Sequence, residues 1–233
     1  MPRLQKLKQQ AHWLIKRSLE LFYRPLVVRY LHSDRRYRYG GVDLIVRTGV
    51  FHPGLFFSTK ILFRYLEEQD LEAKRFLEIG AGTGLLSIRA AQRGADVVAL
   101  DISRRAIANL IDNAERNHVS IEVVESNMFS RLSKQLFDVV VVNPPYYPGN
   151  PENESEYAWY CGANFEFFDS LFSGLHAYID DRSLVIMNLS QDCKIETILS
   201  LAAQRGLHFE LAHQERVLWE KNYVYRLRQG TAQ

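Results

Sequence analysis

Cysteines, long apolar runs and repeated segments are scarce or absent in this sequence. The 233 residues include two cysteines, Cys161 and Cys193, so at most one disulfide bridge can form. Neither has a partner at metal-ligand spacing, and the histidines have none either, so we expect buried reduced thiols and no metal site. No stretch approaches the roughly 20 apolar residues of a membrane span. Lysines and arginines interrupt the start of the chain, so no signal-peptide pattern is present. We therefore expect a cytoplasmic protein with no membrane partner.

The net charge of +2 conceals an uneven distribution of charge along the chain. Residues 1–47 contain eleven lysines and arginines against three acidic residues, a net charge of +8, which leaves −6 for the remainder. A basic segment of this kind suits an anionic partner such as RNA, the ribosome or an acidic protein face. The alternative is a helix that caps the domain and exposes its charges to water.

The first part of the chain differs in pattern from the rest. Apolar residues at helical spacing predict a helix over residues 4–31. Residues 35–58 contain paired glycines and a short apolar run, which predict a small hairpin or loop. Ser58 or Thr59 is suited to cap the helix that follows. We assign residues 1–48 to a basic N-terminal extension that consists of a helix and a hairpin.

Beyond residue 70, strand-like and helix-like segments alternate. Strands are predicted at 75–80, 96–101, 121–126, 137–143, 183–190, 207–217 and 222–229. Helices are predicted at 84–93, 103–117, 165–178 and 192–205. This alternation indicates an α/β fold with a mostly parallel seven-stranded sheet and helices on both faces. Only a turn separates the last two strands, so they should pair antiparallel.

Three glycines, Gly80, Gly82 and Gly84, lie between a predicted strand and a predicted helix. Glycine allows the backbone to turn sharply and to approach a ligand where a Cβ would clash. Asp101 ends the next strand, where a carboxylate can accept hydrogen bonds from both ribose hydroxyls. The combination predicts a nucleoside cofactor site. Dinucleotide binding and a simple tight turn remain alternatives.

The tetrad Asn143, Pro144, Pro145 and Tyr146 follows the apolar run 137–142. The Asn143 side-chain oxygen and the Pro144 carbonyl oxygen can accept both N–H groups of a planar NH2 and hold its nitrogen for attack. The prolines fix φ and remove competing donors. Tyr146 can stack on a planar substrate group. We assign these four residues as catalytic, with a plain proline-rich loop as the alternative.

A glycine loop followed some sixty residues later by this tetrad resembles the class I S-adenosylmethionine-dependent N-methyltransferases. Within that class the chain is similar to the HemK-like enzymes, small methyltransferase domains that modify a glutamine amide of translation release factors. Three further segments carry the resemblance: Gly49 to Pro53, Thr59 to Leu62, and Ala158 to Asn164. The resemblance implies a Rossmann-like domain over residues 49–233 with the last strand reversed. It also implies S-adenosylmethionine as the cofactor.

By the same resemblance, the cofactor-binding residues are Thr59, Glu78, Gly80, Ala81, Gly82, Thr83, Gly84, Asp101, Ile102, Asn127, Met128 and Asn143. Asn127 stands where most family members have an acidic residue that accepts from the adenine amino group. An asparagine oxygen can still accept this hydrogen bond, but without a charge. The chain also departs from the family at Gly54 to Ser58, where acids are usual, and in its basic extension.

The predicted activity is methyl transfer to a planar NH2 nitrogen. The first choice of acceptor is a glutamine amide in a protein such as a release factor. The second is an exocyclic base amine in RNA or DNA, which the basic segment favours. A catalytically idle module that keeps the cofactor fold for binding is the alternative of another class. We also expect a mobile polar loop at residues 148–156 beside the active site.

Overall fold

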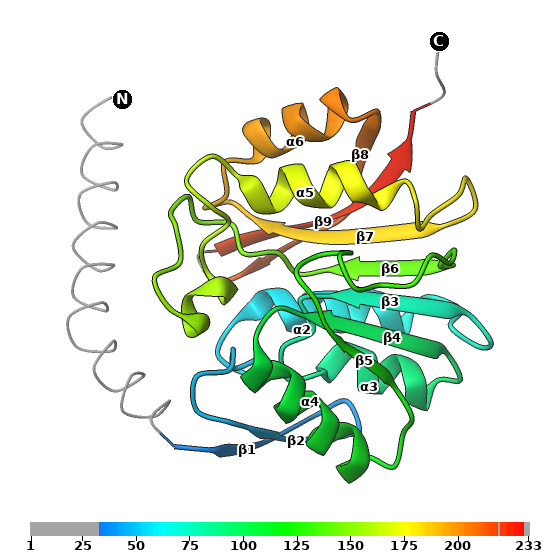
Figure 1. Ribbon diagram of the computed structural model, residues 1–233, viewed down its shortest axis with the longest axis vertical. Coiled ribbons are helices and arrows are strands. Elements are labelled where there is room, and N and C mark those ends of the chain that lie inside the picture. The colour runs from blue at the N-terminus through cyan, green and yellow to red at the C-terminus, as the bar shows by residue number, and fades with distance from the viewer. Residues whose placement is uncertain (1–32, 219, 231–233) are drawn as a thin grey trace.

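The computed structural model describes residues 33–218 and 220–230, and Figure 1 shows their arrangement. The helix predicted over residues 4–31 lies outside the described residues, as does most of the basic segment. Both cysteines, Cys161 and Cys193, are buried free thiols, as expected. Within the described part of the chain, no helix is both long enough and apolar enough to cross a membrane.

A seven-stranded sheet forms the centre of the molecule. Its strands are β3 (Arg75–Ile79), β4 (Asp96–Asp101), β5 (Glu122–Glu125), β6 (Val139–Val142), β7 (Leu184–Ser190), β8 (Leu207–Val217) and β9 (Glu220–Gln229). Their order across the sheet is β5-β4-β3-β6-β7-β9-β8. The pairs along β5 to β7 are parallel, and β9 runs antiparallel to both of its neighbours. The predicted mostly parallel sheet with a reversed last strand is therefore confirmed.

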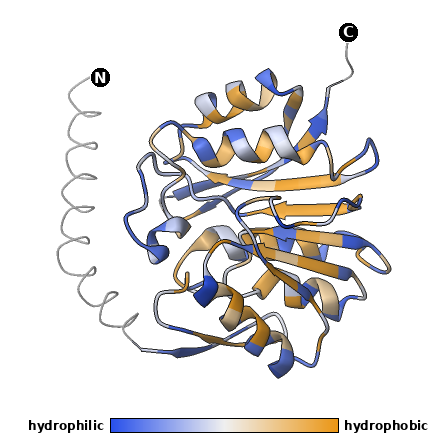
Figure 2. Cartoon of the chain, in the orientation of Figure 1, coloured by the Kyte–Doolittle hydropathy of each residue, from blue (hydrophilic) through white to orange (hydrophobic). Residues whose placement is uncertain are grey.

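Helices cover both faces of this sheet, because its central strands are apolar on both sides (Figure 2). On one face α5 (Glu166–Leu175) and α6 (Ile195–Gln204) pack on the larger hydrophobic cluster. The other face carries α2 (Phe57–Glu67), α3 (Leu85–Gln92) and α4 (Arg104–Arg116). All four valines of β6 are buried, which places the strand end after Val142 at the middle of the molecule.

The start of α2 differs from the prediction. The N-cap residue is Phe56, and no side chain caps the helix. Ser58 and Thr59 lie inside the first turn instead, and both are buried. The physical reason is that an N-cap residue has an extended backbone, as Phe56 does, whereas Ser58 and Thr59 are already helical. Their hydroxyl groups accept hydrogen bonds from Asn143 instead.

A separate two-stranded hairpin precedes the sheet, formed by β1 (Arg35–Tyr39) and β2 (Val42–Val46). Gly40 and Gly41 both have positive φ, at 55° and 83°, as a two-residue hairpin turn requires. Val42 and Leu44 are buried in the same hydrophobic cluster as α2 and α3. The predicted hairpin is confirmed. The predicted boundary after residue 48 divides segments that share this cluster, and it stays a prediction.

Candidate active site

A cavity of about 500 Å³ lies at the carboxyl ends of β3, β4, β5 and β6. Parallel α/β sheets bind ligands at this edge, because the strand order reverses there and leaves a crevice. The cavity is lined by all the predicted catalytic residues and all the predicted cofactor-binding residues except Gly84. Predicted residues from five separate stretches of sequence are thus brought together around one cavity.

The glycine loop, residues 80–84, lines one side of the cavity. Gly80 and Gly82 have φ of 74° and 55°, and a Cβ built on either would meet no atom within 4 Å. Both positions therefore leave room for a ligand against the backbone. Gly84 also has positive φ, but a Cβ there would lie 2.8 Å from Cγ of Leu110 on α4. Its absence of a side chain serves the close packing of the loop on α4, and its role in cofactor binding stays a prediction.

Asp101 is held firmly at the end of β4. Its Oδ2 accepts from the backbone N–H of Gly82 at 2.8 Å, and its Oδ1 accepts from the backbone N–H of Ser103 at 2.8 Å. Burial raises the pKa of this carboxyl above its ordinary value. A carboxylate has about four acceptor positions, so two remain for a ligand's hydroxyl groups. This geometry fits a nucleoside ribose.

Glu78 is buried at the base of the same cavity. One of its oxygens accepts from the backbone N–H of Ser87 at 2.9 Å and from the Ser87 hydroxyl group. Burial, the largest effect, raises the pKa of Glu78 to about 8. A cationic ligand group beside it would favour the ionised carboxylate.

The turn after β5 places Asn127 and Met128 on the cavity wall. The Ser126 hydroxyl donates to the carbonyl oxygen of Met128 at 2.7 Å, and Met128 has a φ of 49°. Ile102, which follows Asp101, is 36% exposed and lies on the same wall. Apolar side chains here can contact a flat heterocycle. The contact of Asn127 with adenine stays a prediction.

Asn143 occupies the far side of the cavity from Asp101's strand. Its Nδ2 donates to Ser58 Oγ at 3.2 Å and to Thr59 Oγ1 at 3.1 Å. Its Oδ1 is buried and has no hydrogen-bond partner. The two hydroxyl groups thus orient the amide and leave a desolvated acceptor at the cavity. Sequence reasoning assigned Ser58 to a helix cap and missed this role.

Two more buried polar residues lie beside the tetrad. Asn188 follows Met187, which pairs with Val142, the residue before Asn143. Asn188 donates to Asn222 at 3.2 Å and is fully buried. Ser190 hydrogen-bonds to Tyr146, whose phenol pKa is raised by burial. The phenol of Tyr146 is therefore neutral, and its hydroxyl group is hydrogen-bonded. The alternation of β7 alone did not indicate these neighbours.

An aromatic group covers the cavity. Phe51 and Phe56 precede α2, and their rings lie 5.5 Å and 4.8 Å from the ring of Trp159. Trp159 belongs to the loop after the tetrad, which forms a short 3-10 helix, η1 (Glu154–Ala158). Glu154 Oε1 accepts from the Ser103 hydroxyl at 2.9 Å. The polar loop expected at residues 148–156 does border the site, and this contact ties it to the start of α4.

Comparison with known proteins assigns the chain to a family. The family described as "Methyltransferase small domain" matches residues 41–159, half of the 233 residues. The chain belongs to this family. S-adenosylmethionine is the cofactor that the family and the cavity both indicate. The matched range begins in the hairpin and ends at Trp159, so it contains the glycine loop, Asp101 and the tetrad.

Individual relatives divide between protein and RNA substrates. A candidate protein N5-glutamine methyltransferase of Methanocaldococcus jannaschii is 41% identical over 115 residues, 49% of this chain and 56% of the relative. A tRNA1(Val) (adenine(37)-N6)-methyltransferase of Phocaeicola vulgatus is 31% identical over 155 residues, 62% of each chain. The chain therefore spans less than two thirds of the length of these relatives.

Solved structures support the fold. A methyltransferase from Pyrococcus furiosus has a TM-score of 0.60 at 17% identity, with 93% of this chain and 99% of that chain covered. At this level of identity the likeness concerns the fold alone. It confirms the expected class I methyltransferase fold.

Proposed function

We propose that this protein transfers a methyl group from S-adenosylmethionine to the nitrogen of a planar NH2 group. The observation that carries the proposal is Asn143, whose Oδ1 is buried and unpartnered in a cavity that also contains Asp101 and the glycine loop. An unpaired buried acceptor costs free energy unless a ligand completes it. A donor N–H of the substrate is the group that this position fits.

Residues of this chain then hold the substrate nitrogen that receives the methyl group. Asn143 Oδ1 and the Pro144 carbonyl oxygen accept its two N–H groups and turn the lone pair toward the cofactor. The bound cofactor supplies the electrophilic methyl carbon. Asp101 would bind the ribose hydroxyls, and Glu78 would interact with the charged part of the cofactor. No general base is required, because the methylated product can lose its proton after transfer.

A protein glutamine amide, as in a release factor, is our first choice of acceptor. It is supported by the glutamine methyltransferase relative and by the HemK-like resemblance of the tetrad. The second choice is an exocyclic base amine in RNA or DNA, supported by the adenine-N6 relative and by the +8 charge of residues 1–47. We propose that the reaction takes place in the cytoplasm. The complete tetrad argues against an idle binding module.

A methyl-transfer assay on cell extract tests this proposal. Extract is incubated with the protein and tritiated S-adenosylmethionine, and the labelled polymer is then treated with nuclease or protease. Label that protease releases supports the glutamine acceptor, whereas label that nuclease releases moves the assignment to a base amine. Asn143→Ala is the control variant.

We expect Asn143→Ala to lower the transfer rate by about 10²–10³-fold while its affinity for S-adenosylhomocysteine stays within a few-fold. The reason is that the lost contact forms mainly in the transition state. Asn143→Asp should be tolerated better with a base amine than with a glutamine amide. A rate near that of the wild type for Asn143→Ala would remove the tetrad from the mechanism.

A further inference from the structure

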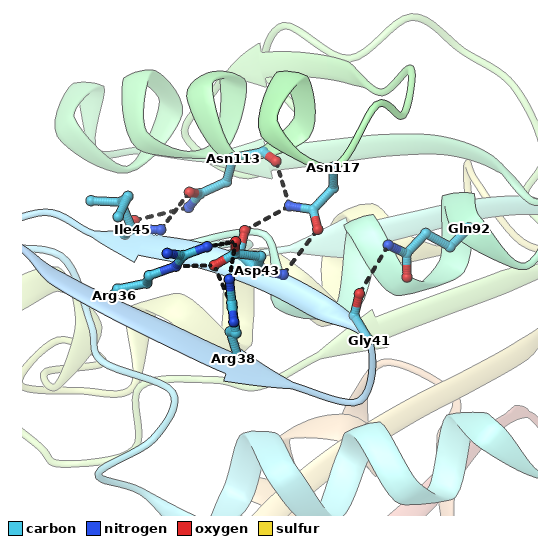
Figure 3. Close-up of polar contacts among 8 residues, drawn as sticks. All are labelled: Arg36, Arg38, Gly41, Asp43, Ile45, Gln92, Asn113 and Asn117. Atoms are coloured by element: carbon cyan, nitrogen blue, oxygen red, sulfur yellow. Dashed lines mark hydrogen bonds and ion pairs between the residues drawn. The ribbon is translucent and has the colours of Figure 1, made fainter.

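Three asparagines follow one another at intervals of four residues, Asn109 and Asn113 on α4 and Asn117 at its C-cap. Figure 3 shows Asn113 and Asn117 beside β2. Asn117 accepts from the backbone N–H of Asp43 at 2.9 Å and donates to the Asp43 carbonyl oxygen at 2.8 Å. Asn113 accepts from the N–H of Ile45 at 2.8 Å and donates to its carbonyl oxygen at 3.1 Å. The side-chain amides thus hydrogen-bond to the backbone N–H and C=O groups of β2, as the backbone of a neighbouring strand would.

Asn109 extends the same pattern toward the cavity. It accepts from the N–H of Arg47 at 3.0 Å and donates to the Ile45 carbonyl oxygen at 2.7 Å. The spacing explains why a helix can do this. Four helical residues rise about 6 Å, and two strand residues rise about 6.8 Å, so every fourth side chain meets every second peptide. We call Asn109, Asn113 and Asn117 the asparagine face.

The two ends of the asparagine face have different neighbours. Beyond Arg47, which Asn109 holds, the chain forms the outer wall of the cavity at Gly49, Val50 and Phe51. The far end, at Asn117, contacts β2 beside Asp43, whose carboxylate is bound by Arg36 and Arg38. None of the three asparagines lines the cavity, so Asn109 and Asn113 can act on it only through the segments that they bind.

Asn113 makes one further contact, which links the hairpin to the cofactor site. Its Nδ2 donates to the carbonyl oxygen of Thr83 at 3.0 Å, and Thr83 belongs to the glycine loop. Asn113 and Asn109 are both fully buried. One side chain therefore binds two segments that are not adjacent in sequence: the glycine loop, which lines the cavity, and β2, which leads to the outer wall.

We propose that Asn113 and Asn109 are positioning residues of the cofactor site. They join the glycine loop and the segment from Arg47 to Phe51 to α4 as one unit, and so fix the width of the cavity between them. Asn117 attaches the hairpin at Asp43 and also donates to the backbone carbonyl oxygen of Asn113 at 2.7 Å, and no hydrogen bond joins it to the glycine loop. This inference rests on the proposed cofactor function, since it concerns how the same cavity is shaped.

The test compares the three asparagines in the full-length protein by isothermal titration with S-adenosylhomocysteine. We expect Asn113→Ala to raise the dissociation constant about tenfold or more and Asn109→Ala to raise it severalfold. Asn117→Ala is the matched control, because it loses the same kind of backbone hydrogen bonds from the same helix. Its affinity should stay within twofold of the wild type even where its melting temperature falls as far as that of Asn113→Ala.

Hydrogen exchange on the ligand-free protein provides a second measurement. Asn113→Ala should accelerate exchange at residues 47–53 and 80–84, and Asn117→Ala should leave both segments unchanged. Equal weakening of ligand binding in all three variants, or no weakening in Asn113→Ala, would overturn the proposal. If Asn113→Ala does not fold, Asn109→Ala decides by the same comparison with Asn117→Ala. A wild-type protein that does not bind the ligand would refute the cofactor assignment, and exchange would still decide whether the asparagines position these segments.

Discussion

At the scale of the residue, Asp101 and Asn127 should contribute unequally to the free energy of cofactor binding. Asp101 is a partly buried carboxylate held by two backbone N–H groups, and Asn127 is an exposed amide on the turn after β5. We expect Asp101→Ala to weaken cofactor binding far more than Asn127→Ala. Charge-assisted hydrogen bonds contribute roughly 1.5–3 kcal/mol each, and a neutral one about 1 kcal/mol. Titration with S-adenosylhomocysteine measures both, and the reverse ranking would refute our assignment of the adenosine contacts.

The raised pKa of Glu78 predicts that the free energy of unfolding depends on pH. Its pKa is about 8 in the folded protein against an ordinary value of 4.5, so between these values the folded state retains a proton that the unfolded chain releases. The free energy of unfolding should therefore fall as the pH rises from about 4.5 to about 8, by at most about 1.4 kcal/mol per pH unit from this group.

Glu78→Gln should remove that contribution, because the amide oxygen can still accept from Ser87 but cannot titrate. Urea unfolding of both proteins at pH 5, 6.5 and 8 measures the difference. The variant should gain stability relative to the wild type as the pH rises. A constant difference across this range would show that Glu78 is not the titrating group.

The hydrogen bonds of Ser58 and Thr59 predict that the orientation of the Asn143 side chain affects the rate of methyl transfer. Together they accept both donors of the Asn143 amide, so the double variant Ser58→Ala with Thr59→Val should allow this side chain to rotate away from the substrate. Misplacement of a reacting group by about 1 Å can cost roughly 100-fold in rate. We expect the double variant to lose about 10- to 100-fold in methyl transfer, measured with the extract fraction that accepts label.

Each single variant retains one acceptor, so each should lose less than the double variant does. Titration with S-adenosylhomocysteine separates a loss of cofactor binding from a loss of geometry. Transfer at the wild-type rate by the double variant would contradict the proposed orientation of Asn143.

At the scale of the element, α4 contacts segments of the site through its N-cap and through its asparagine face. Its N-cap, Ser103, accepts from the N–H of Ala106 and donates to Glu154, which ties η1 to the helix. Its asparagine face holds the hairpin. The helix was predicted from apolar periodicity, which concerns only the side that packs on the sheet. Its polar side carries the contacts that shape the cavity.

The contact between α4 and η1 predicts how the loop after the tetrad behaves. Glu154→Ala should accelerate hydrogen exchange over residues 148–160 and speed release of S-adenosylhomocysteine, because Trp159 would no longer be held against Phe51 and Phe56. Glu154→Gln keeps an acceptor for the Ser103 hydroxyl and should have a smaller effect. Glu152→Ala, an exposed neighbour on the same loop, is the control. Unchanged exchange in Glu154→Ala would show that the aromatic contacts alone hold the loop.

At the scale of the whole molecule, charge is separated along the chain, with a net charge of +8 on residues 1–47 and −6 on the remainder. Removing residues 1–33 should leave a folded protein that binds S-adenosylhomocysteine but binds its macromolecular substrate less tightly. The loss should be greatest at low salt, because salt screens such contacts. Substrate binding at several salt concentrations measures this. Unchanged binding would end the electrostatic interpretation, and an insoluble product would identify the segment as a packed cap.

The sequence by itself determined the order of strands and helices, the glycine loop, Asp101 and the tetrad. These follow from local physics, since apolar periodicity, glycine backbone freedom and proline geometry act over a few residues. The tertiary structure decided which distant groups complete the site. Asn143 meets Ser58 and Thr59 across 85 and 84 residues of chain, and Asn113 meets Ile45 across 68. Polar side chains such as these carry no periodic signal, and their partners are set only when the faces of the elements pack together.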